Sequence, residues 1–405
     1  MQTAPTPDRR AIERCAGDPD RFVREHWGRA PLLRRGSGPG GFDDLLSLAD
    51  VDRILATTSP RTPAFRLVKD GRPLPPAAYT KPGRVGSVPL SDLADPGRIY
   101  QLFGGGATIV LQGLHRYWPP LTRLCRGLEL FLTHPTQVNA YLTPPASQGL
   151  AVHHDTHDVF VLQVHGRKHW LVWDPVIPNP LPDQKLPADA PAPGEPLVDA
   201  ELGPGDCLYV PRGFRHAAKT GTAASLHLTV GMLAPTWNQL LREVVERATA
   251  EAAFREPLPV GYADDPAAFA DGVAERVAEL RRFLDKVDPR RIAEDAAHRF
   301  WSARPPLLDG QLRQLLQLDE LGDHSVVRRR EGAVCRLRPR GERLEVLLGD
   351  RELSMPARLE PAMRQLLAAE RFAVAELAGV LDEPSRLVLV RRLVREGLLE
   401  SVAVA

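Results

Sequence analysis

The fold of this chain is decided by the stretch GLAVHHDTHDVFVLQVHGRKHWLVWDP, residues 149–175. It contains two runs rich in β-branched and aromatic residues, 159–164 and 169–173, and this composition is typical of β-strands. The segment HGRK between them, residues 165–168, is short, mostly polar and contains a glycine. The sequence therefore predicts two strands joined by a hairpin turn.

Similar runs occur throughout residues 63–234. They read FRLV, TIVLQG, QVNAYLTPP, DCLYVP and SLHLTVGML, and turn-forming residues separate them. Many short strands with few helices between them indicate a sandwich or a closed barrel. We predict a mainly β domain over residues 1–235, a sandwich or a closed barrel, including a helical lead-in around Phe22 and Trp27.

A helical region is predicted over residues 236–305. Thr236 is a suitable N-cap, and Pro257 is expected to end the helix that Thr236 begins. A second helix should follow Pro266. The apolar residues of the first helix share one face, as do those of the second; they are Trp237, Leu240, Leu241, Val244, Val245, Ala248 and Ala252, and Phe269, Val273, Val277, Leu280 and Leu284. Apolar stripes of this kind favour pairing with a second copy of the chain, so we expect a homodimer.

The last predicted domain covers residues 306–405 and begins after the Pro305-Pro306 break. Strand-like segments flank Gly341, and three short helices are expected after them. The last of these helices carries an apolar face made of Leu387, Val390, Leu393 and Val394. This order of elements resembles a winged-helix module.

The bulk composition is that of an ordinary soluble globular protein. Of 405 residues, 43% are hydrophobic and 25% are charged, and the net charge of +1 provides no overall field for nucleic acid or an anionic membrane. No stretch approaches the length of a membrane span. The cysteines Cys15, Cys125, Cys207 and Cys335 are widely spaced, which suggests neither a zinc motif nor a disulfide framework. A cytoplasmic location is expected.

The candidate metal ligands are His153, Asp155 and His216. Side chains two apart on a strand share a face, so an imidazole and a carboxylate could reach one ion. His216 follows the tight segment LYVPRGF, from which a returning strand could bring it beside the first two. Two histidines and one carboxylate, with the opposite coordination positions open, are typical of non-haem Fe(II) oxygenases.

Further candidates would bind 2-oxoglutarate, the co-substrate of many such enzymes. Lys168 is a suitable cation for its distal carboxylate. Asn139 and Tyr141 share a face of the preceding strand-like segment and could add hydrogen bonds. His157 has the parity of the ligands and could line the target pocket or form a local hydrogen bond, whereas His154 should point away. Structural roles are expected for His165, His169 and His227.

The segments NAYLTPPASQGLAVHHDTHDVFVLQVHGRKHWLVW, LYVPRGFRHAA and SLHLTV together resemble the Jumonji C (JmjC) ribosomal oxygenases. The N-terminal FVREHWGRAPLL is also similar to this family. The resemblance implies a catalytic domain with the double-stranded β-helix jelly-roll of the cupins, a helical dimerisation region and a C-terminal winged helix. It also implies an enzyme that uses Fe(II), 2-oxoglutarate and O2 to hydroxylate a histidine or arginine side chain of a ribosomal protein.

The resemblance assigns the iron ligands to His153, Asp155 and His216, and the co-substrate residues to Lys168, Asn139 and Tyr141. It adds Thr229, and more loosely Ser225, on the strand whose hydroxyl groups lie near the co-substrate. A lysine at position 168 is more similar to the histidine-hydroxylating members than to the arginine-hydroxylating bacterial type.

Three alternatives stay open at this point. The target could be a peptide or amino acid of a biosynthetic pathway, or a methylated lysine that hydroxylation would demethylate. The jelly-roll could instead be a metal-binding cupin without oxygenase activity, coupled to a regulatory winged helix. A cluster of arginines suggests nucleic acid, which we do not expect as a partner, because such clusters are often solvated surfaces; it comprises Arg328, Arg329, Arg330, Arg336, Arg338 and Arg340.

Overall fold

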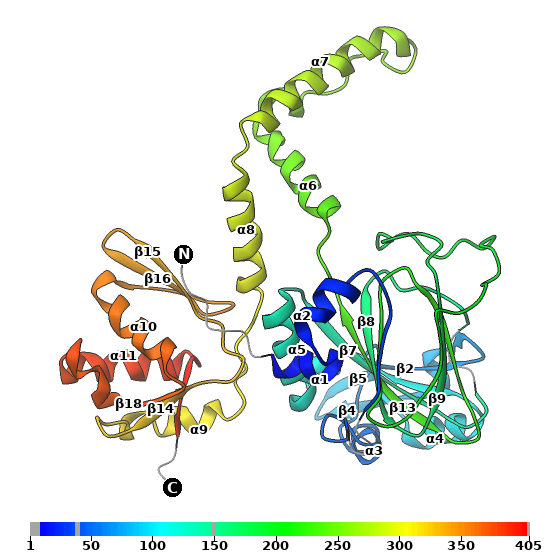
Figure 1. Ribbon diagram of the computed structural model, residues 1–405, viewed down its shortest axis with the longest axis horizontal. Coiled ribbons are helices and arrows are strands. Elements are labelled where there is room, and N and C mark those ends of the chain that lie inside the picture. Colours follow the sequence, from blue (N-terminus) through cyan, green and yellow to red (C-terminus); the bar gives the residue numbers. More distant parts are fainter. Residues whose placement is uncertain (1–8, 37–40, 148–150, 403–405) are drawn as a thin grey trace. The chain divides into compact units, whose positions relative to one another are not determined.

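The computed structural model describes residues 9–36, 41–147 and 151–402 (Figure 1). The chain divides into two compact units, Met1–Ala234 and Pro235–Ala405.

The first unit contains a β-sandwich. Its larger sheet has eight strands in the order β1-β11-β8-β13-β7-β6-β2-β3, and its smaller sheet has the order β10-β9-β12. Neighbouring strands in both sheets run antiparallel. The strands of the two sheets are β1 (Leu32–Arg34), β2 (Phe65–Lys69), β3 (Arg72–Pro73), β6 (Thr108–Leu111), β7 (Thr136–Thr143), β8 (Asp158–His165), β9 (Lys168–Trp173), β10 (Val198–Leu202), β11 (Cys207–Val210), β12 (Arg215–Thr220) and β13 (Ser225–Met232).

Helices cover the outer face of the larger sheet, and Figure 1 shows α1, α2 and α5 on that side. The remaining elements of this unit are α1 (Arg10–Ala16), α2 (Pro19–Arg21), η1 (Phe22–His26), α3 (Leu48–Thr57), η2 (Pro76–Ala78), the two-stranded sheet of β4 (Thr80–Val85) and β5 (Val88–Ala94), α4 (Pro96–Gly104), η3 (Leu114–Arg116) and α5 (Pro119–Leu132). The mainly β architecture predicted for this region is confirmed.

The strands alternate between two apolar layers. Phe160 and Leu162 of β8 pack in the layer beneath the helices, whereas Val159 and Val161 lie in the layer between the two sheets. Because successive side chains of a strand point to opposite faces, this alternation identifies the interior positions of every paired strand. Asn139, Tyr141 and Thr143 of β7 therefore face the interior, and so do Ser225, His227 and Thr229 of β13.

The predicted hairpin between β8 and β9 is wrong. β8 pairs with β11 and β13 in the larger sheet, whereas β9 pairs with β10 and β12 in the smaller one. The turn at Gly166 therefore carries the chain from one sheet to the other. Gly166 has a φ of 64°, and a Cβ atom there would lie 1.9 Å from the carbonyl oxygen of Ala224. The strand pattern alone could not distinguish this turn from a hairpin, because the partners of both strands lie far away in sequence.

Helices begin the second unit: α6 (Trp237–Glu246), the short turns η4 (Arg247–Ala250) and η5 (Ala252–Arg255), α7 (Pro266–Asp285) and α8 (Pro289–Ser302). Thr236 caps α6, and Gln239 returns the hydrogen bond, as a capping box. The α-helix ends at Glu246, well before the expected end at Pro257, so Ala248 and Ala252 do not continue its apolar face. Tighter turns replace it, and the amide of Glu251 donates to the carbonyl of Ala248 three residues back.

The rest of this unit contains two small sheets, in the orders β18-β14-β19 and β15-β16-β17. Its elements are α9 (Gln311–Leu316), η6 (Leu318–Glu320), β14 (Val326–Arg329), β15 (Arg336–Arg340), β16 (Arg343–Leu347), β17 (Glu352–Pro356), η7 (Ala357–Leu359), α10 (Glu360–Ala368), β18 (Arg371–Ala373), η8 (Val374–Gly379), α11 (Glu383–Arg395) and β19 (Leu399–Val402). The middle one of the three predicted helices is the 3-10 turn η8, preceded by a strand. The apolar face predicted for α11 is buried at Val390, Leu393 and Val394.

Several arginines of the predicted basic cluster have partners within the second unit. Arg328 bonds Glu400 at 2.7 Å, and Arg330 is buried and donates to Gln311 at 2.7 Å. The guanidinium of Arg336 lies 4.1 Å from the ring centre of Trp301. These contacts reduce the positive charge that the cluster presents to solvent.

All four cysteines are free thiols. Among the described residues, no helix combines the length and apolar character needed to cross a bilayer.

Candidate metal centre

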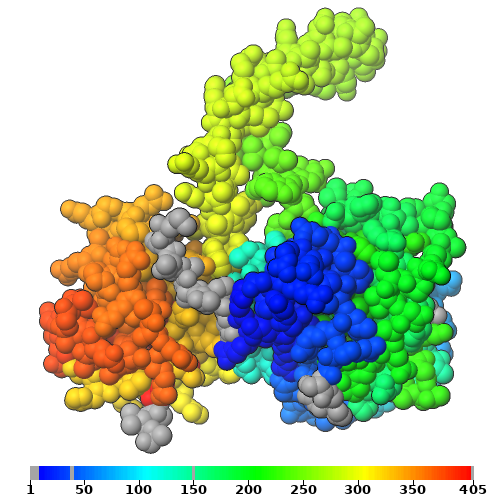
Figure 2. All heavy atoms as spheres, in the orientation of Figure 1, coloured from blue at the N-terminus to red at the C-terminus, as the bar shows by residue number. Residues whose placement is uncertain are grey.

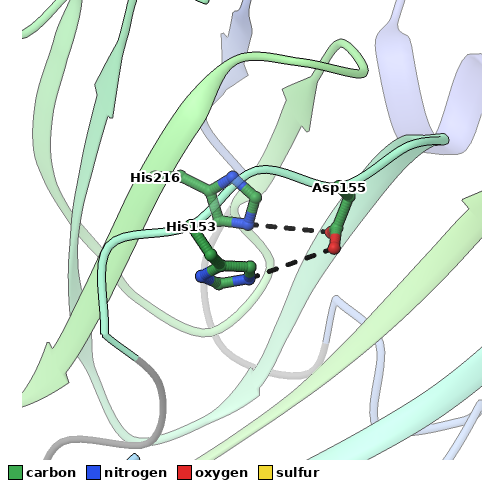
Figure 3. A group of neighbouring side chains, drawn as sticks. All are labelled: His153, Asp155 and His216. Atoms are coloured by element: carbon green, nitrogen blue, oxygen red, sulfur yellow. Dashed lines mark ion pairs between the residues drawn. The ribbon is translucent and has the colours of Figure 1, made fainter. Parts of the chain in front are cut away.

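Three side chains meet at one end of the sandwich interior, as Figure 3 shows: His153, Asp155 and His216. One nitrogen or oxygen atom of each lies within 4.8 Å of the others. The carboxylate of Asp155 lies 4.0 Å from His153 Nε2 and 3.7 Å from His216 Nε2. The structure therefore brings together the three residues that the sequence singled out as ligands.

Backbone carbonyls orient both imidazoles. His153 Nδ1 lies 2.8 Å from the carbonyl of Ala151, and His216 Nδ1 lies 3.0 Å from that of Phe214. A carbonyl can only accept, so each Nδ1 carries the hydrogen and each Nε2 keeps a free lone pair. Both Nε2 atoms face Asp155. This tautomer and orientation are those of a histidine prepared to ligate a metal.

The electrostatics of the group also suit a metal. Burial, with His153 as a second cause, lowers the pKa of His216 to about 4, so its imidazole is neutral at neutral pH. Burial raises the pKa of Asp155, but the neighbouring imidazoles, His216 foremost, outweigh it and keep the net pKa below the ordinary value. His216 thus offers a neutral nitrogen and Asp155 an anionic oxygen, and neither must lose a proton before a metal binds.

The local structure around the ligands differs from the prediction in one respect. His153 and Asp155 do not lie on a regular strand; His153 forms an isolated antiparallel bridge with His216 of β12, and Asp155 lies in the irregular segment before β8. The amide of Gly213 donates to the carbonyl of Asp155 at 2.8 Å. The segment joins the smaller sheet at a single residue, which is enough to align the ligands but too short for a strand.

Lys168, the first residue of β9, is buried inside the sandwich at 4% exposure. Its Nζ donates to Thr143 Oγ1 at 3.1 Å. Burial lowers the pKa of Lys168 to about 7. A buried ammonium normally has an anionic partner, and its only hydrogen-bond partner among the described residues is this neutral hydroxyl.

The other predicted residues line the same interior. Asn139 accepts from the amide of Gly113 at 3.0 Å, and Thr229 is its register partner on β13. Tyr141 lies opposite His227, with parallel rings 5.1 Å apart. Ser225 is fully buried and accepts from Gln163 Nε2 at 2.9 Å, so its hydroxyl already has a structural partner.

The remaining histidines separate into two groups. His154 points away from the ligands and approaches the carbonyl of Gln184 at 2.9 Å, as expected, and His169 pairs with Asp199 at 2.6 Å. His157 lies over Gly231 of β13, where a Cβ would come within 2.6 Å of the imidazole. His157 therefore lies at the interior face, close to Asp155, whose pKa its charge lowers.

Sequence reasoning missed three interior residues. Thr143, the partner of Lys168, has the same parity as Asn139 and Tyr141, and that spacing could have indicated it. Trp170 lies on the same face of β9 as Lys168. Arg66 of β2 is paired in register with Val110 of β6, which in turn pairs with Tyr141 of β7. Burial raises the pKa of the Tyr141 hydroxyl, and the charge of Arg66 partly offsets this effect. No motif marks Arg66.

A two-sheet jelly-roll with two histidines and an aspartate at one end of its interior defines a metal-binding domain of the JmjC class. In agreement, the sequence model of the JmjC domain matches residues 114–240.

Comparison with known proteins identifies the family. The chain is 31% identical over 316 residues to ribosomal oxygenase 1 of Gallus gallus, covering 73% of this chain and 51% of that protein. It is 32% identical over 228 residues to the bifunctional lysine-specific demethylase and histidyl-hydroxylase NO66 of Drosophila persimilis, covering 52% of this chain and 29% of that one. The chain belongs to the JmjC-domain ribosomal oxygenase family. It spans about half the length of the Gallus gallus relative, or less for the Drosophila one.

A solved structure extends the similarity in fold to nearly the whole chain. It is that of the ribosomal oxygenase YcfD from Escherichia coli in complex with cobalt and 2-oxoglutarate, with a TM-score of 0.52 and 21% identity. The match covers 95% of this chain and 97% of that one.

Proposed function

We propose that this protein is an Fe(II)- and 2-oxoglutarate-dependent oxygenase that hydroxylates a histidine or arginine side chain of a ribosomal protein. The observation that carries the proposal is the pairing, within one sandwich interior, of the oriented His153, Asp155 and His216 group with a buried lysine that has no anionic partner among the described residues. The similarity to a ribosomal oxygenase supports the ribosomal target, and the similarity to a histidyl-hydroxylase supports the histidine.

Fe(II) suits the donor set, because two imidazoles and one carboxylate occupy one side of an ion and leave its other positions for co-substrate and oxygen. The side chains of His153 and Asp155 are 33% and 29% exposed, compared with 5% for His216. The group is therefore open on the side of His153 and Asp155, where ligands and a target residue would enter. The Escherichia coli structure of the same fold contains cobalt, an ion that often replaces iron in crystals.

Lys168 distinguishes an oxygenase from a cupin that only binds metal. Burying an ammonium group is costly, and a site that binds metal alone gains nothing from it. A dicarboxylate co-substrate offsets that cost with a charge-assisted hydrogen bond. We assign Lys168, with Thr143 beside it, to the distal carboxylate of 2-oxoglutarate, and Asn139, Tyr141 and Thr229 to the walls of the same pocket.

When bound, iron and 2-oxoglutarate would supply the oxidising chemistry that converts a target C–H bond into an alcohol. The chain itself contributes position rather than acid or base catalysis. The carbonyls of Ala151 and Phe214 fix the ligand tautomers, Lys168 sets the direction of the co-substrate, and the apolar layer between the sheets excludes water.

The second unit is proposed to form a homodimer through α6 and α7, with a winged-helix-like domain after α8. Figure 2 shows the exposed surface of α7 in yellow-green. Large apolar side chains on both helices are exposed to solvent, with the exposed fractions Trp237 (78%), Leu241 (57%), Val245 (43%), Val273 (44%) and Val277 (44%). A closed two-fold pairing would bury them. We propose that the protein is cytoplasmic, because free thiols and ribosomal proteins are both present in the cytoplasm.

Two measurements test this function. Purified protein with iron, 2-oxoglutarate and oxygen should form succinate, and its rate should rise when ribosomal proteins from a deletion strain are added. Tandem mass spectrometry should then find one added oxygen atom on a histidine or an arginine. Absence of succinate formation in the iron-loaded protein would exclude the oxygenase.

A further inference from the structure

Two buried ring nitrogens near Lys168 have no hydrogen-bond partner among the described residues: Nε1 of Trp170 and Nδ1 of His227. Trp170 is 6% exposed and His227 is 3% exposed. They come from opposite sheets, Trp170 from β9 and His227 from β13, and both point into the interior.

The two rings belong to a continuous aromatic layer that crosses the sandwich. Tyr141 stacks on His227, and His227 meets Trp170 edge to face at 5.4 Å and 89°. Trp170 lies 6.2 Å from the imidazole of His216, at an angle of 28° between the planes. The layer therefore extends from the candidate metal ligand to the wall of the candidate co-substrate pocket.

Lys168 lies next to this layer. It precedes Trp170 by two residues on the same face of β9, and its charge, after burial as the larger cause, lowers the pKa of His227. His227 is consequently a neutral imidazole, which has one N–H group to donate. An indole N–H can only donate. The interior thus combines the ammonium of Lys168 with an indole and a neutral imidazole. Neither the indole nitrogen nor His227 Nδ1 has a hydrogen-bond partner among the described residues.

A buried donor without a partner destabilises the folded state, so folded proteins rarely keep one unless a ligand or ordered water satisfies it. Packing alone does not require these nitrogens, because an apolar aromatic side chain at either position would pack without an unpaired polar atom. Lys168 and Trp170 share a face of β9, and the Trp170 ring contacts that of His227. An ammonium and ring N–H groups on these adjoining faces suit a carboxylate, which accepts at up to four positions.

We propose that His227 and Trp170 are co-substrate-positioning residues whose ring N–H groups hydrogen-bond the dicarboxylate that Lys168 binds. This inference rests on the proposed function. It gives both rings a role in co-substrate binding in addition to their aromatic packing. Lys168 would provide most of the attraction, and the two rings would fix the direction in which the co-substrate approaches His216.

The test uses the full chain with Mn(II) in place of iron, under anaerobic conditions, and measures 2-oxoglutarate binding by calorimetry. His227→Phe and Trp170→Phe keep the aromatic contacts and remove the nitrogen. Each should weaken 2-oxoglutarate by roughly tenfold or more, while the affinity for Mn(II) alone stays within about twofold. His165→Phe is the matched control, because His165 is exposed at the end of β8, and it should bind as the wild type does.

Wild-type affinity in folded His227→Phe and Trp170→Phe would overturn the inference while leaving the oxygenase intact. Failure of the wild-type protein to bind 2-oxoglutarate would instead reject the proposed function.

A second measurement needs no variant. In ¹⁵N-labelled wild-type protein loaded with Zn(II), saturating 2-oxoglutarate should shift an indole N–H resonance downfield among those of the six tryptophans. If Trp170→Phe does not fold, this spectrum tests the role of Trp170 in the wild-type protein. Six unchanged indole resonances would contradict that role.

Discussion

His153 and His216 are joined by two reciprocal backbone hydrogen bonds, in which the amide of His153 donates at 3.2 Å and the amide of His216 donates at 2.8 Å. The backbone thereby sets the spacing of the two imidazoles, whose ring centres lie 4.3 Å apart. Because this bridge involves no side chain, the geometry of the group should survive the loss of a ligand or of the metal.

Asp155→Ala should remove metal binding and succinate formation while the fold persists. Asp155 is partly exposed and contributes little packing, so the loss of stability should be about 1 kcal/mol or less. Calorimetry with Mn(II) and thermal unfolding measure the two effects. Asp199→Ala removes a surface carboxylate and is the control. Full activity in the iron-loaded Asp155→Ala protein would show that the ligands were assigned wrongly.

Lys168→Ala should weaken 2-oxoglutarate by roughly ten- to a hundredfold, because a hydrogen bond to a charged group is worth about 1.5–3 kcal/mol. The affinity for Mn(II) should change little. Lys168→Glu should be worse, since it adds repulsion to the lost bond. Calorimetry under anaerobic conditions separates the two ligands. If Lys168→Ala bound 2-oxoglutarate with unchanged affinity, the site could still be that of a metal-binding cupin, but the oxygenase proposal would lose its support from Lys168.

The affinity for 2-oxoglutarate should fall as the pH rises. Burial lowers the pKa of Lys168 to about 7 in the free protein, and only the protonated amine pairs with a carboxylate. Binding above pH 7 must therefore take up a proton, and the dissociation constant should rise by up to about tenfold per pH unit. Calorimetry in buffers of different ionisation enthalpy measures this uptake directly. Binding without proton uptake at pH 8 would contradict it.

The protein should be a homodimer by size-exclusion chromatography with light scattering. The double variant Trp237→Glu, Leu241→Glu should shift it toward the monomer, because both side chains would otherwise be buried by the partner. Arg242→Glu changes charge on another face of the same helix and should stay dimeric. A wild-type protein that is monomeric at every concentration would argue against α6 and α7 as the dimerisation region.

Gly166→Ala should destabilise the first unit by about 2 kcal/mol or more. The added Cβ would collide with the carbonyl of Ala224, and the positive φ disfavours any side chain. Gly86 has a similar φ of 57° and open space around it, so Gly86→Ala should cost only about 1 kcal/mol. Chemical denaturation compares the two variants. Equal losses would mean that the turn between the sheets adapts to the added methyl group.

The sequence by itself determined the strand-rich domain, the capped helix at Thr236 and the identity of the three metal-ligand candidates. Each of these depends on local information: alternation along a strand, a side chain that bonds its own backbone, or an H-x-D pair with a later histidine. Lys168 was also proposed from the sequence, because 2-oxoglutarate needs a cation for its distal carboxylate and the family resemblance points to this position.

Only the tertiary structure decided which sheet each strand joins, and the partners within the site. β8 and β9 look like a hairpin because local pattern contains no information about partners distant in sequence. The same limit concealed Arg66, whose strand reaches Tyr141 through register with β6, and the contact between His227 and Trp170. Burial and hydrogen-bond satisfaction depend on all neighbours at once, so an unpaired buried nitrogen can be recognised only in the packed structure of the two sheets.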